Sequence, residues 1–175
     1  MPWSPRRPPR LSTFDYCGLY SYFVTCCTDA RAAVFTAPAV VGSLREIVLH
    51  SAAERFFVVN ADIWMPDHLH MILTACRPQG NFLQTMKLIR QRTAIAWSGP
   101  GRLWQDAYYD HVIRPEEPLV HFVEYIVMNP VDAGLVADPA QYPFLYLQDA
   151  YREFFFPAPS RKDAPDPARD SATRN

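Results

Sequence analysis

The 175-residue sequence has only two lysines, Lys87 and Lys162, so nearly all of its positive charge is arginine. Its formal net charge of −1 lacks the basic excess usual in nucleic-acid-binding proteins, although a local basic stripe would be sufficient for binding. None of the four cysteines forms a Cys-x-x-Cys pair, which argues against a zinc ribbon. No apolar run is long enough to span a membrane, so we predict no membrane partner. The N-terminus has Arg and Pro where a signal peptide needs an apolar stretch, so we expect a cytoplasmic protein.

The apolar content is sufficient for one folded domain, because 49% of the residues are hydrophobic and 14% are aromatic. The 17 prolines concentrate at the two ends of the chain. We therefore expect a Pro/Arg-rich N-terminal arm over residues 1–13, a catalytic domain over residues 14–150 and a disordered Pro-rich tail over residues 151–175.

Hydrophobic periodicity predicts alternating strands and helices along the globular part. Strands are expected over residues 18–28, 56–65, 68–75 and 103–114. Helices are expected over residues 38–55, 82–97 and 119–128. The last helix should end at Asn129, because the residue before a proline is disfavoured in the α conformation. The order predicts an α+β fold: a ferredoxin-like split βαβ antiparallel sheet, with helices on one face and an added C-terminal helix.

The most informative short motif is His68-Leu69-His70, at the start of a predicted strand. Residues i and i+2 of a strand point to the same side, so both imidazoles project together. Two neutral imidazoles are a reasonable partial shell for a divalent ion. Taken alone, such a pair is more often incidental than metal-binding. Asp67, directly before the pair, could orient a ligand histidine or cap the turn.

Tyr125 and Asn129 lie four residues apart on the last predicted helix and so share a face. A tyrosine phenol is a suitable nucleophile for reversible phosphoryl transfer, and an Asn amide oxygen can ligate a metal. The alternative is a core tyrosine on an amphipathic helix that ends in an Asn cap.

Taken in order, these features resemble the HUH single-tyrosine transposases, named for His, hydrophobic residue, His, and most closely the REP-associated branch. The matching stretches are YFVTCCT with a later Phe35, WMPDHLHMIL, a basic helix, LWQDAYYDHVIR, EYIVMNPVDAGLV and YPF. They cover about residues 14–146, and the ordered set is far more specific than any single motif.

The resemblance implies a transposase that cleaves and rejoins single-stranded DNA near hairpins, with a divalent metal, Mg or Mn, as cofactor. It implies that His68 and His70 are metal ligands and that Tyr125 is the nucleophile of a 5′-phosphotyrosine intermediate. Asn129 matches the third ligand, where the insertion-sequence branch has a Gln. Both monomers and homodimers that exchange the tyrosine helix occur among such proteins.

Six further residues are candidates for contact with DNA, since arginine, lysine and histidine can bind phosphates or bases. They are Lys87, Arg90 and Arg92 on the second helix, His111 on the fourth strand, and Arg6 and Arg7 in the N-terminal arm. For each there is a structural alternative: a solvated charged face, strand packing or a disordered arm.

Two other functions fit the same sequence. A domesticated protein could bind DNA hairpins with little or no mobilising activity. A metal-dependent phosphoesterase could use activated water in place of Tyr125. Cleavage by a Tyr125→Phe variant would favour the phosphoesterase over the transposase. Tight, metal-independent hairpin binding with no cleavage would favour the domesticated protein.

Overall fold

The computed structural model describes residues 14–158, and all seven predicted elements are present in the predicted order. The strands are β1 (Ser21–Cys27), β2 (Phe57–Met65), β3 (His68–Ala75), β4 (Tyr109–Ile113) and β5 (Leu145–Leu147). The helices are α1 (Pro38–Glu54), α2 (Phe82–Ala96), α3 (Leu119–Asp132) and α4 (Asp149–Phe155). Short 3-10 turns lie at Asp29–Arg31 and Pro139–Gln141.

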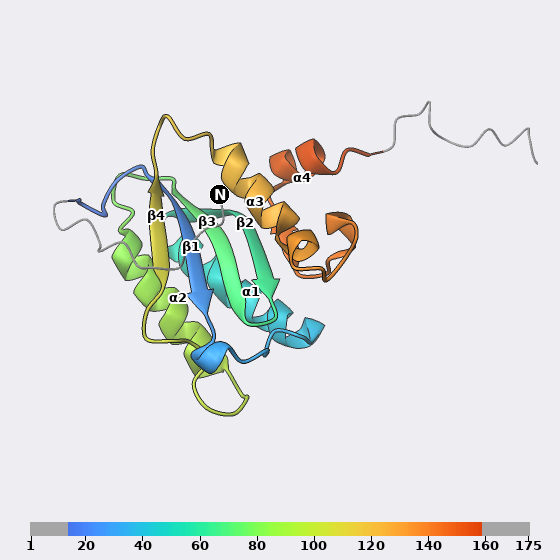
Figure 1. Ribbon diagram of the computed structural model, residues 1–175. Helices are drawn as coiled ribbons and strands as arrows, with labels where there is room; N and C mark the ends of the chain where they lie inside the picture. The colour runs from blue at the N-terminus through green and yellow to red at the C-terminus, as the bar shows by residue number, and fades with distance from the viewer. Residues whose placement is uncertain (1–13, 159–175) are drawn as a thin grey trace, which may run out of the picture.

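The five strands form one sheet in the order β4-β1-β3-β2-β5, and every neighbouring pair is antiparallel (Figure 1). The first four strands have the order of a split βαβ fold, so the predicted ferredoxin-like architecture is confirmed. Pro66 and Asp67 form the tight turn between β2 and β3, and Met65 pairs with His68 across it. This turn places the two histidines at one end of a central strand.

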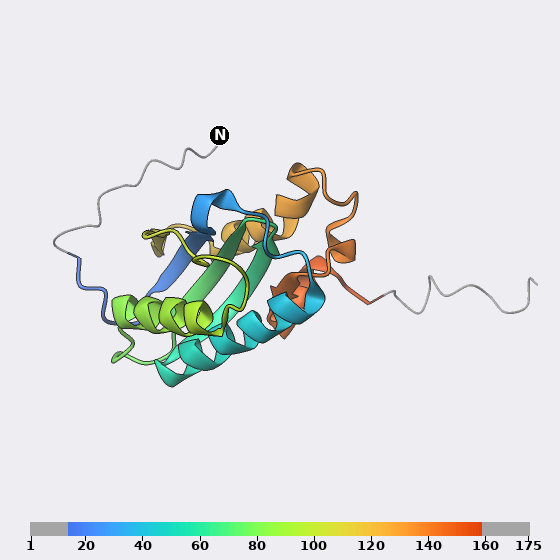
Figure 2. The ribbon, with the colours of Figure 1, turned by 90° about the horizontal axis from the view of Figure 1, so that it is seen from below.

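The two faces of the sheet have different covers (Figure 2). Helices α1 and α2 lie side by side on one face, whereas α3 packs on the other face against β2 and β3. Successive side chains of β1 point to opposite faces of the sheet. Tyr22 stacks on Phe82 of α2, with 3.9 Å between ring centroids. Phe23 contacts Phe122 of α3 on the other face, with 5.9 Å between ring centroids. The tyrosine-bearing helix therefore faces the side of the sheet that α1 and α2 leave open.

The predicted fourth strand is too long at its start, because β4 begins at Tyr109 and not at residue 103. Trp104 is 6% exposed, and its indole Nε1 donates a hydrogen bond to Thr93 Oγ1 on α2 at 2.8 Å. The segment before β4 is therefore packed into the core around Trp104. Its strand pairing there is an isolated β-bridge between Trp104 and Thr28. The aromatic pattern of the segment reflects burial and not strand pairing.

The predicted end of the tyrosine helix is also wrong, because α3 continues through Pro130 to Asp132. Proline removes one N–H donor, but the final turn is closed by Ala133 N–H to Asn129 O (3.0 Å) and by Leu135 N–H to Pro130 O (2.9 Å). The helix ends at Asp132 with Ala133 as its C-cap, and Gly134 follows with a φ of +70°, the left-handed conformation common after a helix C-terminus. Pro130 is itself buried, so packing offsets the lost hydrogen bond.

The short elements after α3 were not expected from the sequence. β5 extends the sheet beside β2, and α4 includes the first five residues of the segment predicted to be a disordered tail. The rest of that tail from residue 159, like the N-terminal arm over residues 1–13, lies outside the described residues. Among residues 14–158, no helix is both long and apolar enough to cross a membrane.

Candidate active site

The strand pairing of β3 determines where the two histidines lie. His70 is opposite Thr25 of β1, and His68 is opposite Cys27. Both imidazoles are on the α3 side of the sheet, with 4.6 Å between their ring centroids. The sequence-based prediction that His68 and His70 project together is confirmed.

Each histidine has a hydrogen-bond partner at Nδ1. The Asp67 carboxylate accepts from His68 Nδ1 at 2.6 Å, and Thr25 Oγ1 lies 2.8 Å from His70 Nδ1. With the protons on Nδ1, both Nε2 atoms keep a free lone pair. Ligand histidines in proteins are typically fixed in this way by a second hydrogen bond.

Burial keeps both imidazoles neutral. It lowers the pKa of His68, although Asp67 opposes the shift, and it lowers the pKa of His70 well below its usual range. Repulsion from His68 when it is protonated, and from the positive charge of Arg31, lowers the pKa of His70 further. Neutral imidazoles are the form that binds a metal ion, so the donor set fits a divalent cation.

The segment after β1 holds the turn that carries the histidines. Thr28 N–H and Phe35 N–H donate to the carbonyls of Asp67 and Pro66, each at 3.0 Å. Arg31 has a positive φ of 56°, and its guanidinium Nε lies 2.8 Å from the Asp67 carboxylate. Asp67 therefore bridges Arg31 and His68, which supports an orienting role for this carboxylate as well as a place in the turn.

Tyr125 approaches the histidines from α3. Its ring centroid lies 5.4 Å from that of His70 and 5.6 Å from that of Phe23, and the residue is 39% exposed. Burial of part of the ring raises the pKa of the phenol, and a hydrogen bond with Asn129 partly offsets this shift. One chain supplies both histidines and the tyrosine, so exchange of the helix with a second copy is not required to bring them together.

Asn129 lies one turn after Tyr125 and is half-buried. Its contact is with the Tyr125 phenol, whereas the sequence suggested that it ligates the metal. Within residues 14–158, no group of three His, Cys, Asp or Glu side chains is placed to hold a metal. Ligation by Asn129 stays a prediction.

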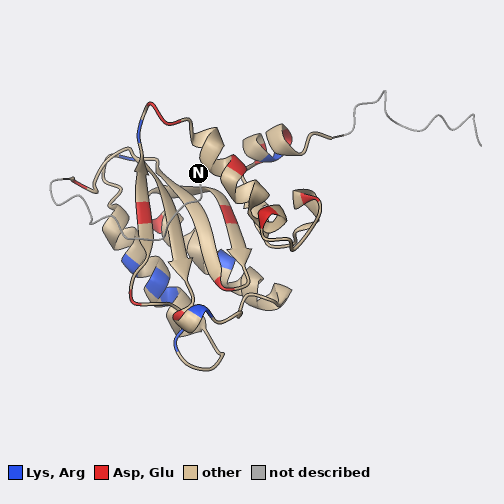
Figure 3. Cartoon of the chain, in the orientation of Figure 1, with Lys and Arg blue, Asp and Glu red and all other residues tan. Residues whose placement is uncertain are grey.

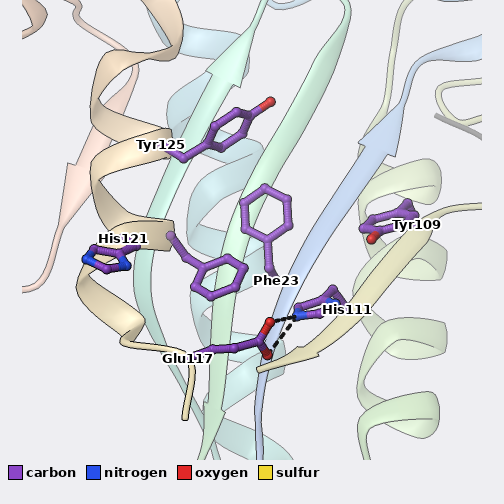
Figure 4. Close-up of a pocket in the computed structure, with 7 residues that line it drawn as sticks. Phe23, Tyr109, His111, Glu117, His121 and Tyr125 are labelled. Atoms are coloured by element: carbon purple, nitrogen blue, oxygen red, sulfur yellow. Dashed lines mark hydrogen bonds and ion pairs between the residues drawn. The ribbon is translucent and has the colours of Figure 1, made fainter. Parts of the chain in front are cut away.

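A cleft of about 390 Å³ opens beside Tyr125 (Figure 4). Its lining comes from β1, β4, α3 and the turn between β4 and α3: Phe23, Tyr109, His111, Glu117, His121, Phe122 and Tyr125. His111, expected to contact DNA, lies in this lining, and its Nε2 is 3.0 and 3.1 Å from the two carboxylate oxygens of Glu117. Glu117 and His121 were not identified as site residues from the sequence.

Helix α2, which carries the predicted basic residues, packs on the face of the sheet opposite to α3 (Figure 2 and Figure 3). Arg92 pairs with Glu54 of α1 at 2.7 Å, and Arg90 donates to the backbone carbonyls of Gln105 and Asp106. Both arginines therefore hold neighbouring segments in place, and Lys87 lines a shallow pocket beside Arg90. Arg6 and Arg7 lie outside the described residues.

The fold and the site define a class: a ferredoxin-like α+β domain with a His-hydrophobic-His strand opposite a helix-borne tyrosine. No family model matches the chain. A REP-associated tyrosine transposase of Escherichia coli (strain K12) is 31% identical over 101 residues, which are 58% of this chain and 61% of that protein. The match thus spans less than two thirds of that relative.

A solved structure of a REP-associated tyrosine transposase bound to a REP hairpin has the same fold, with a TM-score of 0.68. The two are 24% identical, and the match covers 89% of each chain. The resemblance to REP-associated tyrosine transposases expected from the sequence is confirmed.

Proposed function

We propose that this chain is a transposase-type enzyme that cleaves and rejoins single-stranded DNA through Tyr125. The observation that carries the proposal is the approach of the Tyr125 ring to His70, at 5.4 Å, from an independent helix. A core tyrosine would need neither an exposed position nor two neutral histidines beside it. The sequence similarity to a REP-associated tyrosine transposase supports the same reaction class.

In the proposed step, the Tyr125 phenol oxygen attacks the phosphorus of a DNA phosphodiester. A new P–O bond joins the tyrosine to the 5′ end of the downstream strand, and the bond to the upstream 3′ oxygen breaks. That oxygen leaves with a proton as a 3′-hydroxyl, while the phenol gives up its proton. The reverse reaction rejoins the DNA, because a phenol oxygen is also an adequate leaving group.

His68 and His70 would hold the divalent ion through Nε2, with Mg or Mn as the proposed metal. When bound, such an ion supplies Lewis-acid polarisation of the scissile phosphate. Asp67 and Thr25 keep the imidazoles in the ligand tautomer by accepting the Nδ1 protons. The Asn129 side chain contacts the phenol and so favours its ionised form.

The DNA partner that we propose is a hairpin with a single-stranded flank. Support comes from the similar solved structure, which is that of a transposase bound to a REP hairpin. The flank would reach Tyr125 on the open face of the sheet.

The test uses a pool of hairpin-bearing oligonucleotides with randomised single-stranded flanks, incubated with the protein and Mn or Mg. We expect a covalent protein–DNA adduct that EDTA suppresses and that Tyr125→Phe abolishes. Tyr20→Phe is a matched control, since Tyr20 is also 39% exposed but is outside the site, and it should keep full adduct formation.

Two results would contradict the proposal. Cleavage that survives Tyr125→Phe would indicate a phosphoesterase that uses water. Tight hairpin binding without cleavage of any member of the pool would indicate a DNA-hairpin-binding protein with no mobilising activity.

A further inference from the structure

Most of the lining of the cleft beside Tyr125 is aromatic. The His111 imidazole stacks on Phe122 with 5.5 Å between centroids and 24° between planes, and Phe122 lies 5.9 Å from Phe23. Figure 4 places Phe23 between Tyr125 on one side and His111 on the other. A flat, uncharged ligand could stack on the aromatic rings that line this cleft. The volume of about 390 Å³ is within the range of small-ligand sites.

One carboxylate faces the cleft from the turn between β4 and α3. Glu117 accepts hydrogen bonds from Arg114 N–H at 2.8 Å and from His111 Nε2 at 3.0 Å. These bonds lower the pKa of Glu117 against the opposing effect of burial, so the side chain is an anion at neutral pH. The Glu117 side chain is 33% exposed, and a carboxylate has about four acceptor positions, so it can accept a further N–H.

The charge of the cleft excludes a phosphate as its occupant. Among residues 14–158, those that line the cleft include neither Lys nor Arg, and the Glu117 anion would repel a phosphate group. A nucleobase has the opposite properties: it is planar and uncharged, and three of the four DNA bases carry an exocyclic amino group that can donate to a carboxylate.

We propose that this cleft binds an unpaired nucleobase next to the phosphate that Tyr125 attacks, and that Glu117 selects bases with an exocyclic amino group. The base stacks against the Phe122 and His111 wall while its amino group donates to Glu117. This inference rests on the proposed function, because it assigns a neighbour to the scissile phosphate. Glu117 is then a specificity residue, and Tyr125 remains the reacting group.

The test compares cytosine with thymine, two pyrimidines that differ at ring position 4. Cytosine has an amino donor there, and thymine has a carbonyl oxygen. Fluorescein-labelled single strands of twelve deoxycytidines or twelve thymidines are titrated with the protein in EDTA at low salt, and binding is followed by anisotropy. We expect the wild type to prefer the cytosine strand by about tenfold, the lower part of the range for one good base contact.

The decisive variant is Glu117→Gln, whose amide can donate to the thymine oxygen, so the preference should fall close to one. Glu116→Gln is the matched control: it is the exposed neighbour in the same turn and removes the same charge. It should keep the tenfold ratio. An unchanged ratio in Glu117→Gln, or a wild type that binds both strands equally, would overturn the assignment of Glu117.

Phe122→Leu tests the stacking wall separately. It should weaken binding of both strands by about tenfold while leaving their ratio unchanged. Undiminished affinity would show that no base stacks there and would overturn the proposal even if Glu117→Gln did not fold. Because EDTA prevents cleavage, this assay can fail while the Tyr125 adduct still forms, and the adduct can be absent while the base preference persists.

Discussion

The hydrogen bond between Thr25 and His70 makes a quantitative prediction about metal binding. Thr25 is 5% and His70 is 3% exposed, so neither partner can exchange the bond for one with water. Thr25→Val keeps the shape of the side chain and removes only the oxygen that lies 2.8 Å from Nδ1. The buried Nδ1–H then has no acceptor, which costs about 1–3 kcal/mol of folding free energy.

The same change affects the tautomer of His70. When a proton on Nδ1 has no acceptor, the tautomer with the proton on Nε2 becomes competitive, and its Nε2 cannot ligate. We expect Mn affinity to fall about 10–100-fold, as for other substitutions of groups that orient metal ligands. Isothermal titration of metal-free protein with Mn measures the affinity, and urea unfolding measures the stability.

Thr74→Val is the matched control for this experiment. Thr74 lies on the same strand as His70, and its hydroxyl is 2.8 Å from Ser21 Oγ, remote from the histidines. It should lose comparable stability but bind Mn like the wild type. Wild-type Mn affinity in Thr25→Val would show that Thr25 does not orient His70 as a metal ligand.

Two other predictions concern the carboxylates near β2 and β3. Asp67→Asn weakens the hydrogen bond to His68 Nδ1 and the ion pair with Arg31. Mn affinity should therefore drop about 10–100-fold in the same titration. An unchanged affinity would show that Asp67 stabilises the turn but does not orient His68. Burial raises the pKa of Asp62 from 3.8 to about 6, although Arg45 pairs with it at 2.9 Å. Because the folded-state pKa is raised, its contribution to stability is fully present below pH 3.8 and is lost as pH rises through 6. The loss is about 3 kcal/mol, and Asp62→Asn should lack it in urea unfolding measured across this pH range; parallel profiles for the two proteins would contradict the assignment.

The parts of the fold that follow from local patterns could be predicted from the sequence. The alternation in β3 indicated that His68 and His70 share a face, and helical spacing placed Tyr125 on a separate element. The end of α3 could not be predicted in this way, because the penalty at Pro130 is offset by burial that only the tertiary structure creates.

The partners of the site residues depend on strand register, which the sequence does not encode locally. Thr25 is 45 residues from His70, and Asp67 meets Arg31 only because the segment after β1 folds over the β2–β3 turn. Arg92 shows the converse case. As an arginine on the second predicted helix it was a candidate for contact with DNA, yet the residue pairs with Glu54 on α1.

In the proposed reaction, Tyr125 forms the covalent bond to DNA. The most direct measurement is mass spectrometry of the protein after reaction with hairpin-bearing DNA and Mn, followed by nuclease and protease digestion. We expect a peptide that carries a 5′-linked nucleotide on Tyr125, together with an upstream DNA fragment that ends in a 3′-hydroxyl. A nucleotide on another tyrosine, or cleaved DNA with free 5′-phosphates and an unmodified Tyr125, would contradict it.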